Sequence, residues 1–195
     1  MNKCRNFLLL QGPIGPFFKE LADALKVGGS RIHKINFWGG DQEFFPEAFS
    51  FKGTIEEWPR FFHQACVRNS ITDLVLFGDR REYHEVAIEV AAHTNPDLRI
   101  WVFEEGYFRP NWITLDQFGV NARSALPTSY RDLMDEVGGL KEVRDPGNTQ
   151  VEPWIREFAP IAAKYYLSGF LKSGSFPNFK YSNFYHISNL AENIK

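Results

Sequence analysis

The stretch Asp73-Leu-Val-Leu-Phe77-Gly-Asp79 decides the fold, because it joins a buried strand to the start of a helix. Its contiguous apolar residues suit a strand that is buried on both faces, as strands of parallel sheets are. Asp79 and Glu82 then match a capping box, which predicts that a helix begins here. A strand that leads directly into a helix is the repeating unit of an α/β domain.

The same alternation of strand and helix extends to both sides of this stretch. Short apolar runs predict further strands at residues 7–10, 31–37 and 98–103. One helix is expected to begin at Phe17 and stop at Gly28-Gly29, and another spans residues 54–68, with Pro59 in its first turn or breaking it. Strands separated by helices imply crossover connections. We therefore predict an α/β fold, a Rossmann-like parallel sheet with helices on both faces.

The pattern loosens after residue 106. Residues 121–150 are rich in turn formers, with a short helix expected at Tyr130 to Val137. A long amphipathic helix follows, and Pro160 inside it predicts a kink or a break. We divide the chain into a Rossmann-like domain at residues 1–150 and a helical connecting region at residues 151–195.

Composition excludes several classes of function. The 195 residues carry a formal net charge of −2, so there is no basic field that would favour nucleic acid. No apolar run approaches the roughly 18 residues needed to span a bilayer. The N-terminal apolar run is too short for a signal peptide, and two cysteines without zinc-finger spacing suit a reducing compartment. We expect a cytoplasmic protein without a metal site.

Ligands of open parallel sheets bind outside the carboxyl ends of the strands. The first such loop, Gln11-Gly-Pro-Ile-Gly-Pro16, enters a helix whose free N–H groups can hold a phosphate. Gln11, Gly12 and Gly15 are therefore candidate binding residues. The alternative is a tight turn with Pro16 near the first helical position. The loop matches neither a Rossmann fingerprint nor a P-loop.

The second loop is Asn36-Phe-Trp-Gly-Gly-Asp41. Gly39 and Gly40 would let the backbone approach a ligand closely. Asp41 can accept hydrogen bonds from sugar hydroxyls, or it caps a turn. Asn36, both glycines and Asp41 are candidate substrate-binding residues.

The third loop and helix start hold Asp79, Arg80, Arg81 and His84. Asp79 is a candidate binding residue, although a helix cap is the simpler interpretation. Two arginines in a first helical turn would oppose the helix dipole, which suggests an anionic partner such as a phosphate or a sugar carboxylate. His84 is a candidate general acid or base, and a structural histidine is the alternative.

The fourth loop, Glu104-Glu-Gly-Tyr-Phe-Arg-Pro110, has the strongest functional signal. Adjacent carboxylates at the end of a buried strand repel each other and resist desolvation. Strand alternation points them to opposite sides, so we expect one of Glu104 and Glu105 to enter a catalytic site. Arg109 can neutralise one of them, in a site or in a stabilising salt bridge. Asn121 continues this segment as a candidate binding residue.

Together these motifs resemble the capsule polysaccharide biosynthesis and export proteins of Gram-negative bacteria, a group of retaining β-Kdo glycosyltransferases. The resemblance covers nearly the whole chain. Its motifs are residues 11–18, 36–41, 77–79 with His84, and 104–110, followed by 114–115, 119–121 with Ser124, 126–127, 165–169 and 176–177. The chain departs from the family at Arg80-Arg81-Glu82, where Cys-Arg-Pro is more usual, and it contains no His-Pro dipeptide and no Ser/Thr-rich CMP-binding motif.

The resemblance implies transfer of Kdo, an acidic eight-carbon sugar, from CMP-Kdo to a lysophosphatidylglycerol-linked acceptor. It implies a GT-B type fold, with the acceptor on the N-terminal domain and the nucleotide on a C-terminal domain. It also implies a nucleophile within Glu104-Glu105. We expect that these residues alone bind no cofactor and do not transfer Kdo. The alternative function is a non-catalytic binding or assembly module of the capsule export machinery, contacting capsule assembly proteins or, as a peripheral protein, the inner-membrane surface.

Overall fold

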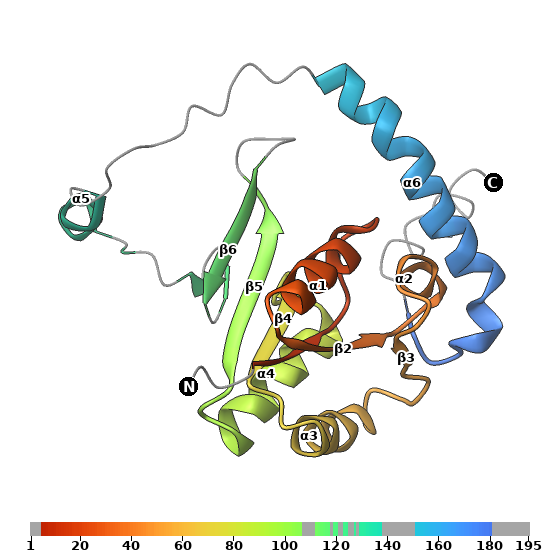
Figure 1. Cartoon of the computed structure of the whole chain (residues 1–195), viewed down its shortest axis with the longest axis horizontal. Coiled ribbons are helices and arrows are strands. Elements are labelled where there is room, and N and C mark those ends of the chain that lie inside the picture. Colours follow the sequence, from red (N-terminus) through yellow and green to blue (C-terminus); the bar gives the residue numbers. More distant parts are fainter. Residues whose placement is uncertain are drawn as a thin grey trace, which may run out of the picture.

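The computed structural model describes residues 5–106, 112–117, 119–120, 123–124, 127, 129–137 and 151–180. Its strands and helices alternate over the first hundred residues, as predicted (Figure 1). In chain order they are β1 (Asn6–Leu9), α1 (Phe17–Val27), β2 (Arg31–Asn36), α2 (Gly39–Phe44), β3 (Phe49–Ser50), α3 (Trp58–Arg68), β4 (Asp73–Phe77), α4 (Glu82–Thr94), β5 (Arg99–Glu105), β6 (Ile113–Gln117), α5 (Tyr130–Val137), α6 (Val151–Leu171) and the 3₁₀ turn η2 (Ser173–Ser175).

The strands form one six-stranded sheet in the order β3-β2-β1-β4-β5-β6. This is the strand order of a doubly wound Rossmann fold, so the predicted fold class is confirmed. The sheet is parallel as predicted except at one edge, where β6, a strand that the sequence analysis did not predict, pairs with β5 in antiparallel fashion. Residues 106–112 are too few for a crossover helix, which a parallel β6 would need.

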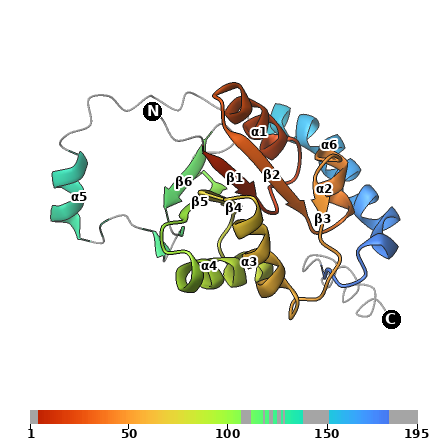
Figure 2. The same ribbon diagram turned by 60° about the horizontal axis from the view of Figure 1, so that its bottom comes forward.

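Helices cover both faces of the sheet (Figures 1 and 2). On one face, α3 and α4 pack on a core that includes Trp58, Phe62 and Ala87. On the other face, Phe18 and Ala22 of α1 pack on alternate residues of the same strands. The central strand β4 is buried along its whole length, as its apolar run predicted.

The observed start of α3 agrees with the sequence prediction, and the observed start of α4 does not. Helix α3 begins at Trp58 with Pro59 in its first turn, which is one of the two predicted outcomes. The capping box predicted at Asp79 is wrong, because α4 begins at Glu82 with Arg81 as its N-cap and without a side-chain cap. Gly78 has a φ of 72°, so the chain turns sharply after β4 and the helix starts later than the motif suggests. Arg81 is therefore the N-cap and Arg80 precedes it, so the two arginines lie at the start of α4 and not within its first turn.

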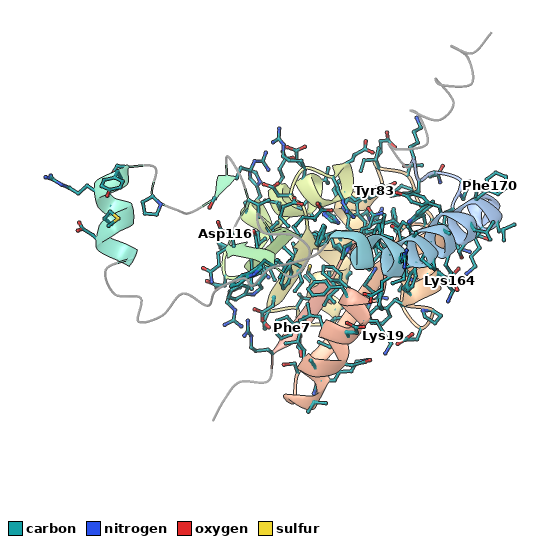
Figure 3. All side chains as sticks on the ribbon, turned by 90° about the horizontal axis from the view of Figure 1, so that it is seen from above. Phe7, Lys19, Tyr83, Asp116, Lys164 and Phe170 are labelled. Atoms are coloured by element: carbon teal, nitrogen blue, oxygen red, sulfur yellow. The ribbon has the colours of Figure 1, made fainter. Side chains whose placement is uncertain are left out.

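The predicted short helix is present as α5, and the long amphipathic helix is α6, which packs against α2. Of the kink or break predicted at Pro160, the break is wrong, because α6 continues through this residue. Proline removes one hydrogen bond from a helix, and Pro160 lies on an exposed face where water can replace it. The outer face of α6 exposes Leu167, Phe170 and Leu171 (Phe170 is labelled in Figure 3).

Candidate active site at the carboxyl edge of the sheet

The strand order reverses between β1 and β4, and a ligand crevice of this fold opens at such a point. The loops that follow these two strands face each other there. Arg81 spans them, because its Nη1 donates a hydrogen bond to the Gly12 carbonyl oxygen at 2.9 Å. The guanidinium also lies 5.7 Å from the centre of the Phe77 ring. A fixed cation therefore stands at the place where the fold is expected to bind a ligand.

The acidic pair lies at the end of β5, within the strand rather than in the loop that we expected. A Cβ atom added to Gly78 would be 3.5 Å from Oε2 of Glu104 and 4.0 Å from Nε of Arg81, so both side chains border Gly78. Oε1 of Glu104 accepts a hydrogen bond from the backbone N–H of Glu105 at 3.0 Å. Glu105 is exposed and, by strand alternation, points to the opposite face. Glu104 is thus the member of the pair that lies beside the Gly78 loop.

His84 is fully buried beneath the same loop. Its Nδ1 lies 2.6 Å from the Gly78 carbonyl oxygen, and because a carbonyl only accepts, Nδ1 carries the proton. Burial, with a contribution from the Arg81 charge, lowers the pKa of His84 to about 3, so the ring is neutral near pH 7. A buried, neutral ring that holds a loop carbonyl fits the structural alternative better than the acid–base role.

We predict that His84 makes the protein acid-sensitive. Its pKa is about 6.5 in the unfolded chain and about 3 in the folded protein. Between these values the unfolded chain binds more protons, so stability is complete above pH 6.5 and falls as the pH falls. The loss at pH 5 is on the order of 2 kcal/mol. Urea unfolding at pH 7 and pH 5 measures it, and His84→Asn should flatten the profile. An equally steep profile in His84→Asn would contradict this assignment.

Asp79 is also buried, and its Oδ2 atom makes no hydrogen bond with the residues that the structure describes. Nε of Arg123 lies 4.0 Å from this oxygen. A Cβ atom on Gly119 would lie 3.0 Å from it, so the segment after β6 closes over the carboxylate. Arg123 also pairs with Glu85 of α4 at 2.9 Å. Asp79 therefore faces the segment after β6 and does not cap a helix.

A second polar cluster lies under α6, around Asp41. Oδ2 of Asp41 accepts the backbone N–H of Phe37 at 3.2 Å, and Oδ1 accepts the hydroxyl of Tyr165 at 3.3 Å. The same hydroxyl accepts hydrogen bonds from Trp38 Nε1 at 2.8 Å and from Gln11 Nε2 at 3.4 Å. Burial raises the pKa of Asp41, against the opposing charges of Lys34 and Arg81. The cluster ties the first two loops to α6.

Lys34 completes this cluster from β2. Its Nζ donates to the Ile35 carbonyl oxygen at 2.7 Å and to Oδ1 of Asn36 at 3.0 Å. Burial lowers the pKa of Lys34 to about 8, although Asp41 opposes the shift. Asn36 is fully buried and donates in turn to the Phe45 carbonyl oxygen at 2.9 Å. With these hydrogen bonds the Asn36 side chain fixes the turn after β2, which is a structural role.

The glycines predicted to approach a ligand are packed against the protein itself. A Cβ atom on Gly39 would lie 2.5 Å from the Ser168 carbonyl oxygen of α6, and one on Gly40 would lie 2.6 Å from Trp38. A Cβ atom on Gly15, whose φ is 111°, would lie 3.0 Å from Ile161 of α6. A pocket beside Gly12, Gly15 and Gly40 encloses about 20 Å³, enough for about one water molecule but not for a sugar.

Comparison with known proteins identifies the family. The model of the family described as capsule polysaccharide biosynthesis protein matches residues 72–194, which is more than half of the chain. The chain belongs to the capsule polysaccharide biosynthesis family. It is 35% identical over 183 residues to the capsule polysaccharide modification protein LipB of Neisseria meningitidis serogroup B. The aligned region is 92% of this chain and 43% of LipB. The chain is 31% identical over 182 residues to the capsule polysaccharide export protein KpsS of Escherichia coli, covering 91% of the chain and 44% of KpsS.

The capsule family match contains Gly78, Arg81, His84 and Glu104, so the loop after β4 and the side chains around it fall inside the match. The chain spans less than half the length of the curated relatives that it matches. No solved structure matches the chain significantly.

The predicted site residues of this capsule family member fall into two groups. Glu104, Asp79 and His84 gather around the Gly78 loop, and Gln11, Gly12, Gly15, Asn36, Gly39, Gly40 and Asp41 gather under α6. Arg81 connects the groups. Glu105 is exposed on the other face of β5 from Glu104, while Arg109 and Asn121 lie outside the described residues, as does the boundary predicted at residue 150.

Sequence reasoning did not place Lys34 in the site, although a lysine within an apolar strand was a usable signal. The described residues include no group of three or more histidines, cysteines, aspartates or glutamates placed to hold a metal ion. Within the same residues, no helix is long and apolar enough to cross a membrane.

Proposed function

We propose that this chain supplies the acceptor side of a capsule glycosyltransferase of GT-B type, which transfers Kdo from CMP-Kdo to a lysophosphatidylglycerol-linked acceptor. The observation that carries the proposal is the Glu104 carboxylate at the end of β5, which borders Gly78 and Arg81 next to the point where the strand order reverses. Membership of the capsule family and the motif resemblance supply the substrate class. The activity is proposed for the whole length of the relatives, of which this chain matches less than half.

The chemistry of a retaining transfer fits this arrangement, because retention requires two displacements. In the first, a Glu104 oxygen attacks the anomeric carbon, the bond from that carbon to the phosphate oxygen breaks, and CMP leaves with the electron pair. In the second, an acceptor hydroxyl attacks the same carbon, gives up its proton to a base, and releases Glu104. The Arg81 guanidinium, held by Gly12, is suited to neutralising the Kdo carboxylate or a phosphate.

A chimera tests the proposal. The matching region of meningococcal LipB is replaced by this chain, and the product is incubated with CMP-Kdo and lysophosphatidylglycerol. We expect LipB and the chimera both to increase the mass of the acceptor by one Kdo residue, as measured by mass spectrometry. If LipB transfers Kdo and the chimera does not, this chain does not supply an acceptor side. If neither protein transfers Kdo, the proposed sugar is wrong.

A non-catalytic binding or assembly module remains the second candidate. It is favoured by the small size of the pocket under α6, whose polar groups bond to one another. The chimera separates the two functions, because a transferase half supports Kdo transfer that depends on Glu104, whereas a module binds the lipid acceptor and supports no transfer. Acceptor binding that is unchanged in Glu104→Gln, together with no transfer by the chimera, would favour the module.

A further inference from the structure

The edge of the sheet at β2 is largely uncovered. Strand β3 pairs only with Ile35 and Asn36, while β1 pairs with residues 31–34 on the inner side. In both Figure 1 and Figure 2, β3 lies at the tip of the β2 arrow. Among the residues that the structure describes, no strand pairs with the outer side of residues 31–33. An exposed edge of this kind is a template for another strand.

The orientation of the backbone shows which groups face outward. Backbone hydrogen bonds of a parallel strand alternate between its two sides. Arg31 donates its N–H inward to the Arg5 carbonyl at 2.9 Å, and Asn36 accepts outward from the Phe51 N–H at 2.9 Å. Ile32 and Lys34 therefore direct their backbone N–H and C=O groups outward, away from β1.

A groove of about 390 Å³ lies along this edge. Its apolar lining includes Phe49, which is 57% exposed and stacks on Phe61 of α3 with ring centres 5.3 Å apart. Its charged lining is mainly basic, and Arg68 stands at the end of α3. Glu47 is the one acidic residue of the lining, and its carboxylate lies 3.6 Å from Lys19. The groove therefore combines an apolar floor with a positive rim.

We propose that this groove binds an extended, acidic segment of a partner protein, which adds to the sheet as a strand beside β2. Such a segment satisfies the outward N–H and C=O of Ile32 and the outward N–H of Lys34, which a lipid chain would leave without hydrogen bonds. Its acidic side chains meet Arg68, and its apolar side chains pack on Phe49. A second copy of this chain fits less well, because it would bring the basic rims together.

The test uses the chain as it is and a fluorescent heptapeptide of alternating glutamate and valine. We expect saturable binding by anisotropy, and slower amide hydrogen exchange at Ile32 and Lys34 when the peptide is bound. Arg68→Glu should weaken binding about tenfold or more, which is a modest change for a reversed charge at a rim. Arg60→Glu is the matched control, because Arg60 is exposed on the same helix and does not line the groove.

Two further peptides and one further measurement can overturn the proposal. A peptide with lysine in place of glutamate, and one with proline at the central valine, should both bind weakly. Equal binding of the proline peptide would exclude strand addition, and equal weakening by Arg60→Glu would indicate general electrostatic attraction only. Absence of saturable binding by the acidic peptide would also overturn it. Exchange at Ile32 and Lys34 that slows with protein concentration, without peptide, would identify a second copy as the occupant.

Discussion

Glu104→Gln is expected to lower the rate of Kdo transfer by the LipB chimera by about 10³-fold or more, because the amide is not a nucleophile. Glutamine keeps the size of the side chain and can still accept the Glu105 N–H hydrogen bond seen at 3.0 Å. The fold and the stability should therefore be unchanged. The measurement is the rate of acceptor modification under saturating CMP-Kdo, compared with the unmodified chimera.

Glu105→Gln is the matched control. The two residues are adjacent in β5, but Glu105 is exposed and points to the opposite face. We expect its substitution to change the rate by less than about threefold, as removal of a charge near but outside a site does. If Glu105→Gln removes activity and Glu104→Gln does not, the nucleophile is the other carboxylate. If both variants remain active, no residue of this pair is the nucleophile.

Detection of the covalent intermediate would test the same assignment directly. A retaining transfer through a carboxylate passes through a sugar esterified to the enzyme. When CMP-Kdo is supplied without acceptor, peptide mass spectrometry should find Kdo on the peptide that contains Glu104. The Glu104→Gln chimera should lack this mass, and Glu105→Gln should retain it.

The sequence predicted the sheet and the acidic pair because both depend on local patterns. The apolar run of β4 and the position of Glu104 at a strand end can be recognised within a few residues. The start of α4 was misplaced because a capping motif does not reveal that Gly78 turns the chain with a φ of 72°. Local motifs thus locate an element better than its boundary.

The polar cluster under α6 was beyond local patterns. Tyr165 reaches Asp41 from 124 residues away in the sequence, and its partners cannot be deduced from spacing. Gly39 and Gly40 illustrate the same limit, since glycine permits a close approach by any backbone. In the structure the backbone that approaches Gly39 is Ser168 of α6. A glycine pair therefore predicts proximity, while the identity of the neighbour requires the fold.

The second large effect is expected at the amino-terminal ends of the parallel strands, where Asp73 begins β4. Its carboxylate is fully buried and accepts hydrogen bonds from Arg99 at 2.9 Å, from Trp101 at 2.9 Å and from Thr72 at 2.6 Å, and it also pairs with Arg5. Asp73→Ala should lower the free energy of unfolding by on the order of 3 kcal/mol, because several donors lose their shared acceptor. Urea unfolding at pH 7 measures the change. Asp97→Ala, an exposed aspartate near the same strand ends, should change it by less than about 0.5 kcal/mol.

The dependence on pH distinguishes this network from simple loss of packing. Burial alone would raise the pKa of Asp73, but the hydrogen bonds from its neighbours, Arg5 foremost, lower it to about 2. Because this pKa lies below the unfolded value of 3.8, the stabilisation is complete above about pH 4 and is lost as the pH falls toward 2. The difference between the wild-type protein and Asp73→Ala should therefore shrink over that range. His84 contributes equally to both proteins and cancels in the difference, so a gap that stays constant down to pH 2 would show that the carboxylate charge is not the source of the stability.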